Sequence, residues 1–156
     1  MNIVIPMAGL GSRFQTAGYT FPKPLIEVWG EPMISLVVKN LNLRGQYIFL
    51  VQKDHYKKYN LDKLLSMIAP GCKIIQIDGI TEGAACTVLK SKEFIDNDQP
   101  LLIANSDQFI KWNSFETISQ FNNKDSDGGI LSFTSIHPKH SFARIGDNGL
   151  VAEVAE

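Results

Sequence analysis

Strand-like apolar runs alternate with helical patterns along most of this chain, and this alternation constrains the fold more than any other feature. Runs typical of buried strands occupy residues 3–7, 47–51, 73–77 and 100–104. Apolar residues at helical spacing occupy 32–43, 54–69 (broken near Asn60), 83–94 and 113–121. Strand–helix–strand units form right-handed crossovers, so this order predicts an α/β fold: a Rossmann-like three-layer sandwich with a mostly parallel central sheet.

The pattern changes after residues 127–129, Asp-Gly-Gly. Short strands are expected at 130–136, 142–145 and 150–154. The last two strands are separated by Gly-Asp-Asn-Gly at 146–149, a strong turn signal, and so predict a C-terminal β-hairpin. A chain of 156 residues suits one domain with one core, so we expect a single domain over 1–156.

Charge and hydropathy exclude several classes of partner. Fifteen Lys and Arg against sixteen Asp and Glu give a net charge of -1, whereas nucleic-acid binders usually carry a basic excess. No apolar run approaches the ~18 residues that a membrane span requires. The first residues indicate a strand rather than a signal peptide. We therefore expect no nucleic acid, no membrane and a cytoplasmic location.

The segment from Ala8 to Pro24 shows no periodicity, and it follows the first strand, where open α/β sheets bind ligands.

 Gly9 and Gly11 let backbone N–H groups approach a phosphate chain closely. Arg13 offers a fork of donors matched to phosphate oxygens, and Lys23 offers a compact charge between two prolines. Together these residues predict a triphosphate cradle; the alternative is a glycine turn with two solvated cations.

Two other phosphate-binding motifs do not match this loop. A P-loop needs four residues between its glycines, followed by Lys and Ser or Thr. A dinucleotide fingerprint needs a third glycine and an acidic residue at the end of the second strand. Here Phe14 stands where the third glycine is required, and Asp54 comes too late after the strand.

Two further positions are candidates for binding a metal ion and a nucleotide base. Asp107 follows the apolar run 101–104, so it is expected at a strand's carboxyl end, where a carboxylate can ligate Mg²⁺. The alternative for Asp107 is a strand-end turn. Gly83 is either a simple helix N-terminal glycine or a small residue that lets a base lie against the backbone.

Two segments together join a glycine loop to two basic residues. They are residues 7–14, Met-Ala-Gly-Leu-Gly-Ser-Arg-Phe, and residues 22–25, Pro-Lys-Pro-Leu. It resembles the signature of the sugar-phosphate nucleotidyltransferases, which include nucleotide-sugar pyrophosphorylases and related cytidylyltransferases. The resemblance covers nearly the whole chain, through residues 30–34, 81–85, 105–107 and 143–149.

The resemblance implies a role for each matching residue. Arg13 and Lys23 would neutralise the triphosphate as catalytic residues, and Asp107 would ligate Mg²⁺. The other matching residues would wrap the triphosphate or lie against the base. These nucleotide-binding residues are Ala8, Gly9, Gly11, Ser12, Glu82 and Gly83.

The resemblance also implies a reaction. A phosphate of the acceptor, a sugar phosphate or a similar phosphorylated small molecule, would attack the α-phosphorus of a nucleoside triphosphate and expel pyrophosphate. Such reactions supply nucleotide-sugar and cell-surface polysaccharide biosynthesis. The alternatives are a cytidylyltransferase acting on a choline-phosphate-like acceptor and a non-catalytic nucleotide-binding module. No glutamine is clearly placed before Gly83, so we expect a pyrimidine nucleotide.

Similar enzymes are longer and place a second metal-binding carboxylate and much of the acceptor pocket farther along. We therefore expect the domain to be truncated at its C-terminal end, with nucleotide binding but little turnover by these residues alone. An unpaired sheet edge would favour association into homo-oligomers or aggregates.

Overall fold

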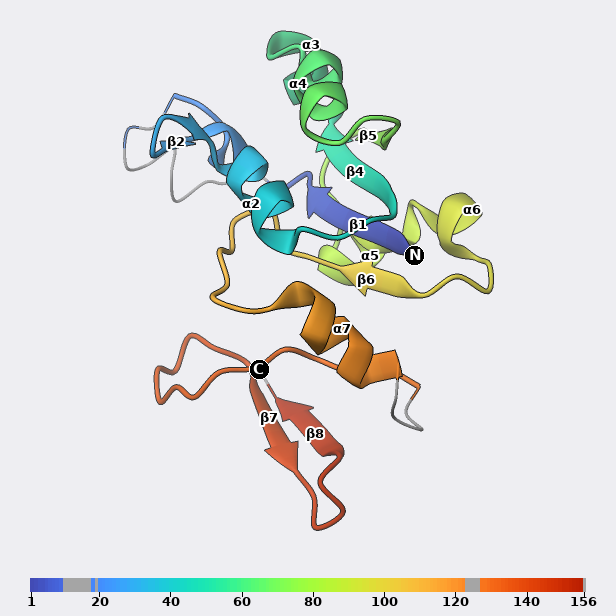
Figure 1. The fold of residues 1–156 in the computed structure, drawn as a ribbon. Helices are drawn as coiled ribbons and strands as arrows, with labels where there is room; N and C mark the ends of the chain where they lie inside the picture. The colour runs from blue at the N-terminus through green and yellow to red at the C-terminus, as the bar shows by residue number, and fades with distance from the viewer. Residues whose placement is uncertain (10–17, 19, 123–126, 156) are drawn as a thin grey trace. The chain divides into compact units, whose positions relative to one another are not determined.

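The computed structural model describes residues 1–9, 18, 20–122 and 127–155. The chain divides into two compact units, Met1–Phe115 and Glu116–Glu156 (Figure 1). The prediction of a single domain over 1–156 stays a prediction.

The first unit is built on a four-stranded parallel sheet. Its strand order is β5-β4-β1-β6, with β1 at Asn2–Met7, β4 at Gln46–Gln52, β5 at Lys73–Ile77 and β6 at Leu101–Ile103. β1 pairs with β4 along its whole length and with β6 only over its first three residues. All four strands expected here from the sequence, and their parallel pairing, are confirmed.

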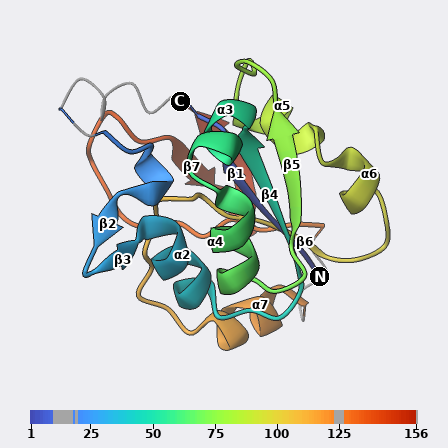
Figure 2. The same ribbon diagram turned by 90° about the horizontal axis from the view of Figure 1, so that it is seen from above.

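Helices cover both faces of this sheet (Figures 1 and 2). Ile3 and Ile5 point toward the face covered by α2 (Met33–Leu41), α3 (Lys53–Lys58) and α4 (Leu61–Ile68). Val4 points to the opposite face, which α5 (Ala84–Leu89) and α6 (Lys92–Ile95) cover. This period-two alternation in β1 buries both faces, as expected of a central parallel strand, and the three-layer arrangement is confirmed. None of the described helices is long and apolar enough to cross a membrane.

The strand order places a topological switch point between β1 and β6. From β1 the chain moves outward through β4 to β5, and it then returns to the other side of β1 to form β6. Ligands of open α/β sheets bind outside the strands' carboxyl ends where the order reverses in this way. The residues after β1 and after β6 therefore face the most favourable place for a ligand.

Pro6 lies inside β1, where a proline would ordinarily remove a ladder hydrogen bond. Even-numbered residues of β1 direct their backbone groups toward β6, because the Val4 carbonyl accepts from the Ala104 N–H at 3.0 Å. The paired part of β6 ends at Ile103, opposite Val4. The N–H that Pro6 lacks would point to the side where β6 has already ended, beside the switch point. The proline therefore removes no hydrogen bond between β1 and β6.

The helix expected at 83–94 is wrong as one element, because the structure divides it into α5 and α6. Ser91 is fully buried, and its hydroxyl donates to the Val88 carbonyl at 2.6 Å. A serine side chain that bonds to the backbone in this way competes with helix continuation. The Ser91 carbonyl instead accepts from Phe94 at 2.8 Å and so begins a new turn.

Two short elements in the first unit were not expected from the sequence. A 3₁₀ turn, η1, covers Lys23–Leu25, and a small antiparallel hairpin pairs β2 (Glu27–Val28) with β3 (Glu31–Pro32). The hairpin turn places both Trp29 and Gly30 at positive φ, as tight hairpin turns require. Elements this short carry no detectable periodicity.

The second unit contains most of α7 (Ser114–Asn122) and a hairpin of β7 (Phe142–Ile145) with β8 (Val151–Ala155). The expected C-terminal hairpin is confirmed, and the Gly146 N–H closes its turn on the Leu150 carbonyl at 2.9 Å. The strand expected at 130–136 is wrong, because these residues form no strand. A strand exists only where a neighbour takes its hydrogen bonds, and no described strand of this unit pairs with the segment.

Candidate functional site

A cavity of about 350 Å³ lies at the switch point. Four segments border it: the carboxyl end of β1, η1, the start of α5 with the turn before it, and the turn after β6. Five of the residues predicted from the sequence share this cavity, although they are far apart in the chain. They are Ala8, Gly9, Lys23, Gly83 and Asp107.

Lys23 is placed by the 3₁₀ turn rather than by an irregular loop. Pro22 precedes the turn with φ -61, and Pro24 is its second residue, so both prolines restrict the backbone around Lys23. The Leu25 N–H donates to the Pro22 carbonyl at 2.8 Å and closes the turn. The sequence interpretation of a rigid frame around this lysine is therefore supported by the local geometry.

Lys23 and Asp107 form an ion pair across the cavity. Their side chains are 35% and 25% exposed, so the pair is partly shielded from water but reachable by a ligand. Asp107 lies in the turn after β6, and Lys23 lies in the segment after β1. A cation and a carboxylate thus meet at the point where the strand order reverses.

The opposite wall of the cavity is formed by the start of α5. Thr81 and Thr87 place their hydroxyl oxygens 2.5 Å apart, and the Thr87 hydroxyl donates to the Gly83 carbonyl at 3.0 Å. This network fixes the backbone around Gly83, where an added Cβ would meet no heavy atom within 4 Å. The wall is therefore rigid and leaves open space above Gly83.

Glu82 is the described site residue that the structure does not bring to the cavity. It is exposed and does not belong to the described lining. Its carboxylate lies 4.0 Å from the Cys86 sulfur, one helical turn away. Three other predicted residues, Gly11, Ser12 and Arg13, lie outside the described residues.

Gln52 is a residue with a positioning role that the sequence interpretation missed. Its side-chain amide donates to the Ala8 carbonyl at 2.5 Å and to the Gly79 carbonyl at 2.8 Å. It thereby ties the end of β1 to the turn that leads toward Gly83. The available signal was its position as the last residue of β4, at the same sheet edge as Ala8.

The donor set around Asp107 fits a magnesium ion. Asn105 and Ser106 border the same cavity, so further oxygen-bearing side chains line it together with the carboxylate. The described residues contain no group of three or more His, Cys, Asp or Glu side chains suited to a metal. Mg²⁺ is commonly bound through one or two carboxylates together with substrate phosphates and water, so a single carboxylate is compatible with it.

Comparison with known proteins bears directly on this site. A family described as nucleotidyl transferase matches residues 3–156, which include every segment bordering the cavity. The chain belongs to the nucleotidyl transferase family. Its membership confirms the resemblance inferred from the glycine loop and the Pro-Lys-Pro segment.

Individual relatives agree with the family assignment. The bifunctional protein GlmU of Campylobacter concisus is 31% identical over 134 residues, which cover 77% of this chain and 30% of that protein. A mannose-1-phosphate guanyltransferase of Aspergillus oryzae is 24% identical over 149 residues, covering 87% and 38%. The chain spans about a third of the length of the curated relatives it matches.

A solved structure shares the fold over almost the whole chain. The nucleoside-diphosphate-sugar pyrophosphorylase from Vibrio cholerae superposes with a TM-score of 0.71 at 27% identity. The match covers 99% of this chain and 66% of that protein.

We predict that Gly83→Val weakens nucleoside triphosphate binding without unfolding the protein. The backbone at Gly83 is extended, with φ 177, and the space beside it is open, so valine introduces no strain. If a base lies against this backbone, the new side chain occupies its place and costs about 1–3 kcal/mol, or at least about a fivefold loss of affinity. Isothermal titration calorimetry measures the affinity.

Gly128→Val is the matched control for this substitution. Gly128 also has open space beside it and is not part of the described cavity lining. Equal nucleotide affinities in Gly83→Val, Gly128→Val and the parent chain would show that the base does not lie at Gly83.

Proposed function

We propose that this chain binds a nucleoside triphosphate at the switch-point cavity as part of a nucleotidyltransferase. The proposed reaction transfers the nucleoside monophosphate to a sugar phosphate or a similar phosphorylated small molecule and releases pyrophosphate. The observation that carries the proposal is the meeting of Lys23, Asp107 and the glycine-bearing end of β1 at one cavity. Family membership supports the same reaction class.

The reaction brings two polyanions together in line. An oxygen of the acceptor phosphate forms a bond to the α-phosphorus, and the bond between that phosphorus and the bridging oxygen breaks. Both electrons of the broken bond leave with pyrophosphate. Positioning and charge stabilisation provide most of the catalysis in such transfers, because little covalent chemistry is left to the protein.

In this proposal each residue has a defined task. Lys23 stabilises the charge that grows on the departing pyrophosphate. The backbone at Gly9 approaches the phosphates, and Gly83 lies beneath the base. Asp107 holds Mg²⁺, which would neutralise phosphate oxygens when bound. Arg13 and Ser12, outside the described residues, are proposed to contact the triphosphate.

The principal rival is a nucleotide-binding module without catalysis. A thermal-shift panel of nucleoside triphosphates with Mg²⁺ tests binding, because ligand at ~100 times its dissociation constant stabilises the folded state by about 2.7 kcal/mol. Pyrophosphate release with sugar 1-phosphates and phosphocholine then tests transfer. Binding without release across all acceptors would favour the module, and the absence of binding would contradict both functions.

We predict tighter binding of CTP or UTP than of ATP or GTP. The described lining of the cavity contains no glutamine, and the amide of Gln52 is already bonded to two backbone carbonyls. A glutamine free to pair with a purine edge is therefore lacking from the described lining, whose amide side chain is that of Asn105. Calorimetric titration of all four triphosphates under one Mg²⁺ concentration measures the preference, and a tighter purine would overturn it.

A further inference from the structure

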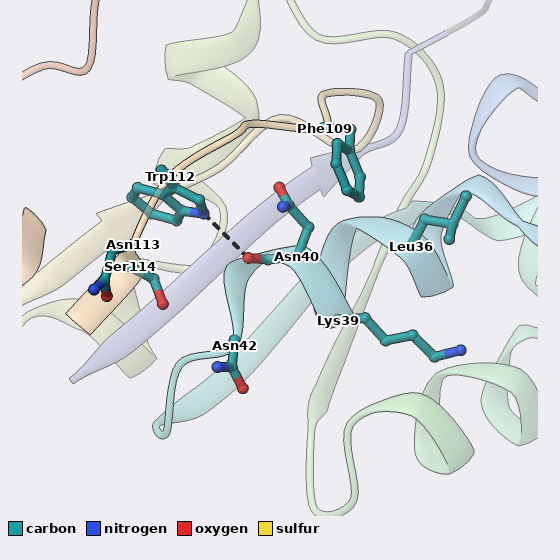
Figure 3. A pocket seen from close by; sticks show the side chains of 8 residues that line it. All are labelled: Leu36, Lys39, Asn40, Asn42, Phe109, Trp112, Asn113 and Ser114. Carbon is teal, nitrogen blue, oxygen red and sulfur yellow. Dashed lines mark hydrogen bonds between the residues drawn. The ribbon is translucent and has the colours of Figure 1, made fainter. Parts of the chain in front are cut away.

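A second cavity, of about 600 Å³, lies between α2 and the segment that follows Asp107 (Figure 3). Several polar side chains around it are already bonded within the protein. Lys39 pairs with Glu31 at 2.6 Å, and the Trp112 indole N–H donates to the Asn40 carbonyl at 3.1 Å. The Trp112 bond forms a joint between α2 and residues 109–114, whereas the Lys39 pair links α2 to β3.

Asn40 is the centre of this joint. Its side-chain oxygen accepts from the Ile110 N–H at 2.8 Å, and its side-chain nitrogen donates to the Ile110 carbonyl at 2.8 Å. The amide therefore pairs with both backbone groups of one residue, as a neighbouring strand would. Together with the Trp112 bond, Asn40 makes three hydrogen bonds to this segment.

The position of Asn40 in α2 explains why its carbonyl is available. The last four carbonyls of a helix have no partner within the helix. α2 ends at Leu41, and Asn42 adopts a left-handed conformation with φ 47, so the Asn40 carbonyl belongs to this final group. The Trp112 indole supplies its partner.

Asp107 lies outside the helices and strands, so hydrogen bonds to neighbouring elements must hold its segment in place. β6 ends at Ile103 and α7 begins at Ser114, and the residues between them form no helix or strand. The Ala104 N–H is bonded to β1 on one side of Asp107, and Ile110 is bonded to Asn40 on the other. Asn40 therefore restrains the chain three residues beyond the carboxylate.

α2 also restrains the segment that carries Lys23. The Met33 N–H at the start of α2 donates to the Ile26 carbonyl at 2.9 Å, directly after the 3₁₀ turn. One helix thus holds the lysine segment at its N-terminal end and the aspartate segment near its C-terminal end.

We propose that Asn40 is a positioning residue that sets the place of Asp107 relative to Lys23. The proposal rests on the proposed function, because it takes metal-dependent nucleotide binding at Asp107 as given. It assigns part of that metal dependence to the contact between Asn40 and Ile110. Asn40 is not among the described residues that line the switch-point cavity, so it would act through the segment 107–112.

The first experiment measures backbone hydrogen exchange by NMR in the absence of nucleotide. Asn40→Ala removes the acceptor of the Ile110 N–H, so exchange at Ile110 should accelerate at least about tenfold. Lys39→Ala is the matched control, because it alters the adjacent residue and the same cavity without touching the segment. Its exchange rate at Ile110 should equal that of the parent.

The second experiment measures the Mg²⁺ concentration that half-saturates nucleotide binding. Asn40→Ala should raise it by about three- to tenfold, while affinity measured in EDTA stays unchanged. Combining Asn40→Ala with Asp107→Asn should add no further shift, because both act on the same carboxylate. Additive shifts, or unchanged exchange at Ile110, would overturn the role of Asn40.

The two proposals fail in different ways. A parent chain that binds no nucleoside triphosphate at any Mg²⁺ concentration contradicts the proposed function. The exchange rate at Ile110 still decides whether Asn40 restrains the segment. Normal metal-dependent binding by Asn40→Ala contradicts the role of Asn40 alone.

Discussion

Replacing Lys23 with alanine is expected to weaken nucleoside triphosphate binding by about ten- to a hundredfold. A hydrogen bond to a charged group contributes about 1.5–3 kcal/mol, and about 1.4 kcal/mol corresponds to a tenfold change in affinity. The loss should be present both with Mg²⁺ and in EDTA, because the ammonium group acts on the phosphates directly. Calorimetric titration under both conditions measures it.

Folding should be nearly unaffected by this substitution. Lys23 is 35% exposed, and partly exposed ion pairs contribute little to stability, typically about 1 kcal/mol or less. Lys92→Ala is the control, because Lys92 also pairs with an aspartate but lies in α6, away from the switch-point cavity. Lys23→Arg should recover part of the affinity, since charge is retained with a different donor geometry. An unchanged affinity in Lys23→Ala would remove this residue from the triphosphate site.

Replacing Asp107 with asparagine is expected to raise the Mg²⁺ concentration needed for nucleotide binding by at least about tenfold. The substitution keeps the size of the side chain but removes the negative charge that a hard cation prefers. It also removes the carboxylate that pairs with Lys23, so affinity in EDTA should not fall. Titration of Mg²⁺ at fixed nucleotide concentration measures the shift.

This signature separates a metal ligand from a structural turn. If Asp107 only shapes a turn, its substitution should lower thermal stability and leave the Mg²⁺ dependence unchanged. If Asp107 is a metal ligand, the substitution should change the Mg²⁺ dependence and leave thermal stability unchanged. Asp96→Asn is the matched control, because Asp96 is the exposed partner of Lys92. The same Mg²⁺ midpoint in Asp107→Asn and the parent would show that Asp107 does not hold the metal.

The sequence determined the layered architecture because burial imposes a period on each element. Strands buried on both faces are continuous apolar runs, as in Ile3–Met7, and helices carry one apolar stripe, as in α2. The glycine loop, the lysine between two prolines and the strand-end aspartate were recognisable because their chemistry is local. Gly146 and Gly149 likewise mark the hairpin turn by residue type alone.

Only the tertiary structure decided which of these groups meet. Lys23 and Asp107 are paired because β6 returns to the open side of β1, a strand order that no local pattern encodes. The division of the helix at Ser91 depended on a buried side chain taking a backbone carbonyl. The bridging amides of Gln52 and Asn40 were likewise invisible in the sequence. Each depends on a carbonyl or N–H group from a distant segment, and such partners are fixed only when the chain has folded.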